Sequence, residues 1–201
     1  MPIFSEGRVL PAPSRADRNV QNASKGHCIA FAVLGAGAGT RMQAESKLEL
    51  DHLKTQFNRC DVADVQEQVR FEFGHRNEFN HYFDMVVTKT SGDRIACTVK
   101  PEVRLESGRF IGEMQTVAWW VKKKKFAQSV RLLTEADLDP VALHNANINA
   151  ALYDEDAQAD QTACLVAREM RGVVSLIECI EQITEACAWR RRCASVAAAA
   201  S

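Results

Sequence analysis

The sequence predicts an α/β fold in which a mixed β-sheet is flanked by helices. Three features lead to this prediction: a helical pattern at residues 43–57, three strand patterns within 68–100, and a helix followed by a short strand within 109–133. A meander of strands, then a crossover helix and one more strand, gives a sheet with antiparallel and parallel neighbours. The chain has 201 residues, 46% of them hydrophobic, which suffices for one ordinary core with a small additional unit.

The first 40 residues are expected to form an extended arm that precedes this domain. Prolines at positions 2, 11 and 13 and glycines at 35, 37 and 39 disfavour a regular helix there. The stretch "LGAGAGTR" (34–41) lacks the Gly-Lys-Ser/Thr ending of a phosphate-binding loop. We therefore expect it to be a loop or the edge of a strand.

Residues 43–57, "QAESKLELDHLKTQF", have the periodicity of a helix. At about 100° per residue, Leu50 and Leu53 fall on one apolar side together with the preceding Met42. Glu49 lies at the edge of that side, one turn before Leu53. Most carboxylates on a surface helix point away from the apolar face, so Glu49 is a candidate functional residue.

Three strands are expected next, at "QVRFEF" (68–73), "YFDMVV" (82–87) and "RIACTVK" (94–100). A three-residue loop at 91–93 would join the last two strands and pair Thr90 with Arg94. In that register Asp84 lies directly opposite Lys100, whereas a two-residue loop would put the two side chains on opposite faces.

The remaining chain is expected to be mainly helical, apart from one short strand. A helix and a buried strand follow the hairpin, at 109–125 and 129–133. Residues 141–201 are expected to form a helical C-terminal region, with apolar positions at helical spacing within 164–192 and a possible break at Gly172. The Ala-rich tail at 197–200 is expected to be disordered.

The pairing of Asp84 with Lys100 allows two interpretations. The simpler one is a cross-strand ion pair, which stabilises a sheet by roughly 0.2–1 kcal/mol. The other is a metal-dependent site for phosphodiester cleavage. Such a site needs hard oxygen ligands for Mg²⁺ and a cation that offsets charge developing on the phosphate. Asp84 would supply a metal ligand, Lys100 the cation, and Glu49 a second carboxylate.

Composition excludes several other classes of protein. The formal net charge is -1, so bulk charge predicts no partner. No stretch approaches the roughly 20 apolar residues of a membrane helix, and no apolar secretory signal is evident. The seven cysteines form no CxxC pair and no zinc-binding cluster, which is typical of reduced cysteines in a cytoplasmic protein. Hydrolases built on Ser/His/Asp or Cys/His have no supporting local motif.

Several basic and aromatic residues outside the hairpin are further candidates. Lys122, Lys123, Lys124 and Lys125 are either a solvated helix end or a site for DNA phosphates, and the arginines at 190–192 allow the same two interpretations. His75 and His81 are expected to be ordinary hydrogen-bonding histidines. Trp119 and Trp120 are expected to serve as one packed and one half-exposed ring.

Five short motifs occur in an order that resembles a known family. They are "ESKLELDHL" (45–53), "VQEQVRFEF" (65–73), "YFDMVV" (82–87), "CTVKP" (97–101) and "SVRLLTEADL" (129–138). This set is similar to the PD-(D/E)XK nuclease superfamily, and more narrowly to the catalytic domain of TnsA-type transposon endonucleases. The resemblance covers roughly residues 43–139. It implies a restriction-endonuclease-like fold for a catalytic domain at 41–140.

The resemblance also implies roles for individual residues. Glu49, Asp84 and Lys100 match the catalytic positions, and Asp84, Glu49, residue 98 and the carbonyl of Val99 match the positions that hold Mg²⁺, for which Mn²⁺ can substitute. The family usually carries Glu, Asp or Gln two residues before the lysine, where this chain has Thr98. A threonine hydroxyl is a neutral, weak Mg²⁺ ligand. Glu113, on the following helix, is the nearest plausible replacement carboxylate.

The expected function is that of a Mg²⁺-dependent DNA endonuclease. By resemblance, it would cut one strand of duplex DNA at a transposon end beside a separate integrase-type transposase. One alternative is a catalytically weakened assembly protein that binds DNA or transposase. Another is a restriction or repair nuclease of the same superfamily.

Overall fold

In the computed structural model, the described residues are 10–20, 28–35, 37–151 and 156–199, with side chains described up to residue 188. The chain divides into two compact units, Met1–Tyr153 and Asp154–Ser201. This division falls after the boundary expected at residue 140. The reason is that helix α3 (Pro140–Ala151) packs against α1 (Lys47–Phe57) and so belongs to the first unit.

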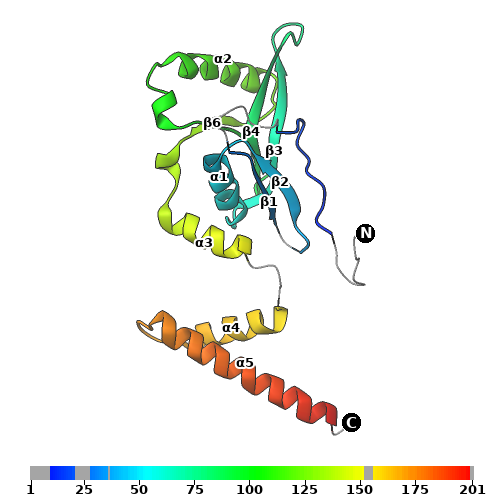
Figure 1. The fold of residues 1–201 in the computed structure, drawn as a ribbon, viewed down its shortest axis with the longest axis vertical. Coiled ribbons are helices and arrows are strands. Elements are labelled where there is room, and N and C mark those ends of the chain that lie inside the picture. The colour runs from blue at the N-terminus through cyan, green and yellow to red at the C-terminus, as the bar shows by residue number, and fades with distance from the viewer. Residues whose placement is uncertain (1–9, 21–27, 36, 152–155, 200–201) are drawn as a thin grey trace. The chain divides into compact units, whose positions relative to one another are not determined.

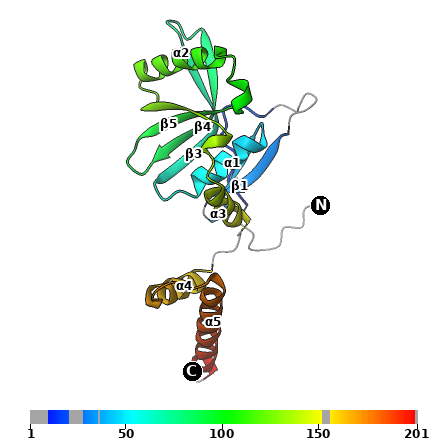
Figure 2. The same ribbon diagram turned by 90° about the vertical axis from the view of Figure 1, so that its left-hand side faces the viewer.

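A four-stranded mixed sheet forms the centre of the first unit, and the predicted α/β class is confirmed. Its strands, in spatial order, are β3 (Val62–Phe73), β4 (Phe79–Lys89), β5 (Arg94–Val99) and β6 (Ser129–Leu133). The first two pairings are antiparallel and β5 pairs with β6 in parallel, because α2 (Arg109–Lys123) makes the crossover between them. Two 3₁₀ turns, Glu102–Arg104 and Glu135–Asp137, follow β5 and β6. Figures 1 and 2 show α1 and α2 on different sides of this sheet.

Each helix covers its own apolar cluster on the sheet. The cluster on the α1 side contains Leu53 of the helix with strand residues such as Val87 and Val99. The cluster on the α2 side contains Val117 and Val121 of that helix with Phe83, which is fully buried. Burying a side chain of this size contributes about 1.5–3 kcal/mol. The candidate residues on β4 and β5 therefore sit on a rigid two-sided scaffold.

The helix α1 begins later than predicted, because a hairpin precedes it. Strands β1 (Ala30–Leu34) and β2 (Thr40–Ala44) pair in antiparallel fashion, and Met42 is a buried strand residue. The prediction of helix from residue 43 was wrong, and so was an arm extending to residue 40. Ser46 caps α1, since its Oγ accepts a hydrogen bond from the Glu49 N–H at 3.2 Å. The helix therefore starts only at residue 47.

Residues 10–20 form an extended segment, called here the N-terminal strap. It docks on the β1–β2 hairpin through backbone bonds from Ala12 N to the Gly39 carbonyl and from Arg41 N to the Ala12 carbonyl, each 2.9 Å long. Further along, Arg15 forms a two-pronged ion pair with Asp64 of β3. Residues 10–20 of the expected arm are thus extended, as predicted, and they are fixed to the β1–β2 hairpin and to β3.

The β4–β5 register differs from the prediction by two residues. Thr88 pairs with Arg94, so the three-residue loop occupies 90–92 instead of 91–93. Gly92 has a φ of 89°, and a left-handed residue at the third loop position is what a three-residue hairpin turn requires. Continuing this register puts Asp84 opposite Thr98. A shift of two residues preserves the face, so Lys100 becomes a diagonal neighbour of Asp84.

At Gln68 the regular alternation of side chains along β3 and β4 is interrupted, so residues before and after this level that should share a face of the sheet point to opposite faces. Val65 packs in the α1-side cluster and Val69 in the α2-side cluster, although simple alternation would put both on one face. The backbone of Gln68 has a φ of 49°, which is uncommon for a residue other than glycine. This residue therefore marks a kink in the strand, directly across from Asp84 on β4.

The second unit is a pair of helices, α4 (Ala157–Glu169) and α5 (Leu176–Ala199). The predicted break occurs at Gly172, whose φ of 76° suits glycine. Helix α5 continues through residues 197–199, so the tail expected to be disordered is helical up to that point. Within the described parts of the chain, no helix combines the length and hydrophobicity needed to cross a membrane.

Candidate active site

Asp84 lies in the middle of the sheet, on the strand between Gln68 and Thr98. Its side chain is 5% exposed, and its Oδ2 accepts a hydrogen bond of 2.7 Å from the Val99 N–H. Its Oδ1 accepts no hydrogen bond from the described residues. Burial raises the pKa of the Asp84 carboxyl, and the positive charge of Lys100 only partly opposes this rise. A carboxylate so placed favours a partner that carries positive charge.

Glu49, in the first turn of α1, lies close enough to Asp84 for the two carboxyl groups to influence each other's titration. Its Oε1 accepts from Ser46 Oγ at 3.0 Å, and its Oε2 accepts from the Glu45 N–H at 2.8 Å and from Gln68 Nε2 at 3.5 Å. Burial and the nearby Asp84 raise the pKa of Glu49 to about 7. The structure therefore brings two of the predicted catalytic residues together, although Glu49 also caps its helix.

Lys100 stands at the end of β5 with its ammonium group unpaired. Within the described residues its Nζ makes no hydrogen bond and no ion pair within 4 Å, and its nearest recorded contact is the Phe110 ring, 5.9 Å from the ring centre. Its charge nevertheless opposes the raised pKa values of Asp84 and Glu49. An ordinary cross-strand ion pair with Asp84 is thus not formed.

Thr98, the residue that departs from the family pattern, is buried, and its hydroxyl is engaged by a histidine. It is 1% exposed, and its Oγ1 lies 3.1 Å from Nε2 of His81. Burial, reinforced by Lys100 and Arg18, lowers the pKa of His81 to about 4, so the imidazole is neutral at pH 7. Val99, expected to offer its carbonyl, uses its N–H to hold Asp84.

Glu113 does not supply a replacement carboxylate. It is exposed and faces Arg109 on its own helix at 3.5 Å. The described residues contain no group of three or more His, Cys, Asp or Glu side chains arranged to hold a metal ion. Of the predicted metal ligands, the structure therefore offers two carboxylates, Asp84 and Glu49, and two neutral groups, the Thr98 hydroxyl and the Val99 carbonyl.

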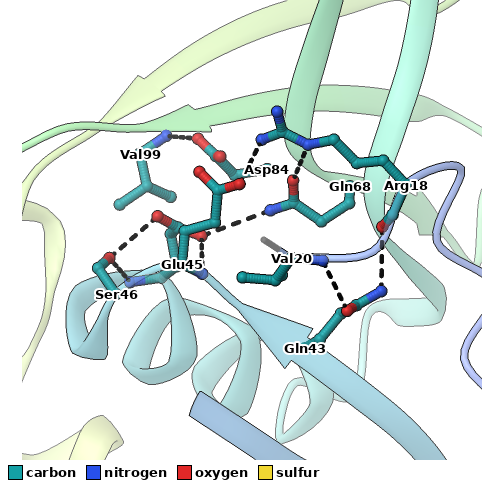
Figure 3. Close-up of polar contacts among 9 residues, drawn as sticks. Arg18, Val20, Gln43, Glu45, Ser46, Gln68, Asp84 and Val99 are labelled. Atoms are coloured by element: carbon teal, nitrogen blue, oxygen red, sulfur yellow. Dashed lines mark hydrogen bonds and ion pairs between the residues drawn. The ribbon is translucent and has the colours of Figure 1, made fainter. Parts of the chain in front are cut away.

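Three further residues at the site were not predicted. Arg18 of the N-terminal strap donates from Nε to Gln68 Oε1 at 2.8 Å and pairs through Nη2 with Glu45 Oε1 at 2.8 Å. Gln68 links this arginine to Glu49, and Figure 3 shows Arg18 bonded to Gln68. Glu45 and Gln68 lie within two of the motifs that resemble the family, so the sequence contained a signal that could have identified them as site residues. Arg18 comes from a segment that no motif covers.

The lysine run lies away from this pocket. It ends helix α2, whereas Lys100 faces Phe110 at the start of the same helix, about 20 Å away at 1.5 Å per residue. Lys124 bonds to the Glu72 carbonyl and Asn77, and Lys123 lies 4.6 Å from the ring centres of both Trp119 and Trp120. The expected division of these rings is confirmed, since Trp119 is 56% exposed and Trp120 packs on the core.

Lys122 and Lys125 have ammonium groups that bond to no described residue, so they are the lysines best placed to meet DNA phosphates. We expect the double change of Lys122 and Lys125 to glutamine to weaken duplex binding evenly across sequences. The log–log salt dependence should flatten by about 0.9 per lost contact. Fluorescence anisotropy at several salt concentrations measures both. An unchanged slope would mean that these lysines are only a solvated helix end.

Comparison with other proteins does not supply a function. The sequence matches no model of a known protein family, and a search of curated proteins finds none with significant similarity. What the site can do is therefore inferred from its own geometry and chemistry.

Proposed function

We propose that this chain is a Mg²⁺-dependent DNA endonuclease, with Asp84, Glu49 and Lys100 as its catalytic residues. The observation that carries the proposal is the meeting of two buried carboxylates beside an unpaired lysine at a strand end. Burying two neighbouring carboxylates without a cation bonded to either is costly, even when each accepts hydrogen bonds, so such a site is seldom kept for stability alone. The order of motifs, which resembles TnsA-type endonucleases, supports the same conclusion.

The residues present fit a magnesium ion. Mg²⁺ prefers oxygen ligands, and Asp84 and Glu49 offer carboxylate oxygens, whose pKa values are raised chiefly by burial. The Thr98 hydroxyl and the Val99 carbonyl are weaker neutral candidates. When bound, Mg²⁺ or Mn²⁺ would supply positive charge against the negative charge that develops on the phosphate.

The protein's own groups would divide the remaining work. The Lys100 ammonium has no internal partner, so it is available to orient the attacking water and to stabilise the pentavalent phosphate. His81, which is neutral, bonds to Thr98, so the positive charge near Asp84 at this end of β5 is that of Lys100. The Val99 N–H fixes the orientation of Asp84.

The biological setting of this proposal is DNA transposition in the cytoplasm. The enzyme would cut one strand of duplex DNA at a transposon end, and an integrase-type transposase would cut and join the other strand. The helical unit after residue 153 would bind that partner or DNA.

A nicking assay tests the proposal. Supercoiled DNA carrying a transposon end is incubated with the full chain and Mg²⁺ or Mn²⁺, with and without the candidate transposase. We expect conversion to nicked circles that EDTA abolishes. Absence of any cleavage in both metals, with the transposase present, would contradict the nuclease. Cleavage at unrelated sequences without a transposase would instead indicate a restriction or repair nuclease.

A second candidate function is a non-catalytic assembly protein that binds DNA or the transposase. The bond between Thr98 and His81 favours it, because it engages the hydroxyl that stands where the family usually has a carboxylate. Stable binding of transposon-end DNA without cleavage in Mn²⁺ would support this role over the endonuclease.

A further inference from the structure

Arg18 is held in place through both its backbone and its side chain. The Arg18 carbonyl accepts a 3.0 Å bond from Gln43 Nε2, and Gln43 Oε1 accepts from the Val20 N–H at 3.0 Å. The guanidinium lies over the Tyr82 ring at 4.5 Å from its centre. Just before it, the Asp17 N–H donates to the Gln68 carbonyl at the strand kink. Arg18 is therefore a fixed cation delivered by the N-terminal strap.

The partner of this cation, Glu45, is a third carboxylate beside the candidate site. It precedes the helix cap Ser46, and its own N–H bonds to Glu49. Figure 3 shows its side chain next to Asp84, and its charge contributes to the raised pKa of Asp84. Asp84 as a whole is 5% exposed, and among the described residues it accepts a hydrogen bond at Oδ2 but none at Oδ1. Asp84 therefore has one carboxylate oxygen available to a cation beside Glu45.

We propose that Glu45 is a further metal ligand of this site, taking the role that the neutral Thr98 fills only weakly, and that its ion pair with Arg18 keeps Glu45 from this role until a cation binds. The inference rests on the proposed function in that a divalent cation enters the pocket. It accounts for the lack of a ready three-carboxylate group, because the Glu45 carboxylate is engaged by the guanidinium. A divalent cation and Arg18 then compete for Glu45, so the strap lowers the affinity of the site for metal.

Mn²⁺ binding to the full chain, measured by calorimetry, tests this competition. We expect Arg18→Gln to tighten Mn²⁺ binding about tenfold, since it removes a nearby positive charge and frees Glu45. Glu45→Gln alone should weaken binding, because an amide can still accept from Arg18 but lacks the charge. In the double variant the gain from Arg18→Gln should shrink to the part that comes from removing the arginine's charge, because Glu45 no longer contributes.

Arg15→Gln is the matched control. Arg15 belongs to the same strap and also binds β3, through an ion pair with Asp64 and a hydrogen bond to the Val65 carbonyl. It forms no hydrogen bond or ion pair with Asp84, Glu49 or Glu45. We expect its affinity for Mn²⁺ to equal that of the wild type. Far-ultraviolet circular dichroism and thermal unfolding check that each variant is folded.

Several outcomes would overturn the inference. They are unchanged or weaker Mn²⁺ binding in Arg18→Gln, equal effects of Arg18→Gln and Arg15→Gln, full affinity in Glu45→Gln, or no Mn²⁺ binding by the wild type. Should Arg18→Gln fail to fold, the Glu45→Gln result decides alone. The nicking assay is a separate test. Metal binding without cleavage would contradict the proposed nuclease activity but would not contradict this inference.

Discussion

Asp84→Asn and Lys100→Met are each expected to lower metal-dependent cleavage by about 10²–10³-fold, the cost typical of losing one group that stabilises the transition state electrostatically. Asparagine keeps the shape of Asp84 and can still accept from the Val99 N–H, so the change removes charge with little effect on packing. Lys100 makes no hydrogen bond or ion pair with the described residues, so methionine removes only its charge. Initial rates of plasmid nicking measure both effects.

Lys89→Met serves as the control for Lys100. Lys89 lies on β4, and its Nζ pairs with Asp61 at 2.8 Å, away from the carboxylates of the candidate site. Its loss should leave the nicking rate within about twofold, because a partly exposed ion pair contributes little. Equal activity in wild type and Lys100→Met would show that the unpaired ammonium is not catalytic.

The sheet could be predicted from sequence because its signals are local. Period-2 apolar runs and turn residues marked β4, β5 and β6 within a few residues of their observed limits. The register was missed by two residues because the loop was placed at 91–93. The rule that a three-residue loop needs a left-handed last position would have chosen Gly92 for it.

The start of α1 was also readable. Ser46 and Glu49 stand three residues apart, which is the spacing of a capping box, and they mark residue 47 as the first helical residue. The apolar periodicity hid this signal, because Met42 fits the helical pattern while belonging to β2. The same capping geometry turns the Glu49 carboxylate inward, so it also explains why this residue lies in the pocket.

The strap and the kink at Gln68 could not be predicted. Arg18 and Asp17 meet their partners on β3 about 50 residues along the chain, and no local pattern encodes such pairings. Glutamine has no intrinsic preference for the left-handed backbone conformation that Gln68 adopts. Hydrogen bonds of its backbone carbonyl to Asp17 and of its side-chain amide to Arg18 and Glu49 accompany that conformation. The charge balance of the site depends on these contacts, so the sequence identified the carboxylates without showing what holds them.

Glu49→Gln is expected to stabilise the metal-free protein at pH 8 while abolishing metal-dependent cleavage. The pKa of Glu49 is about 7 in the folded state and near 4.5 when exposed. Between these values the folded state holds a proton that the unfolded state has released, so stability falls as the pH rises through this window. The full penalty is about 3 kcal/mol, and weaker hydrogen bonds to glutamine leave a net gain of about 2 kcal/mol.

Urea unfolding in EDTA at pH 5 and pH 8 measures this difference. The variant should exceed the wild type clearly at pH 8 and little or not at all at pH 5, because the wild-type carboxyl is then mostly protonated. Glu113→Gln, at an exposed position on α2, should show no such change with pH. A stability difference equal at both pH values would mean that Glu49 is an ordinary helix cap. A difference that appears only at high pH and shrinks when Mg²⁺ is added would mean that the fold carries a destabilising charge for a cation to relieve.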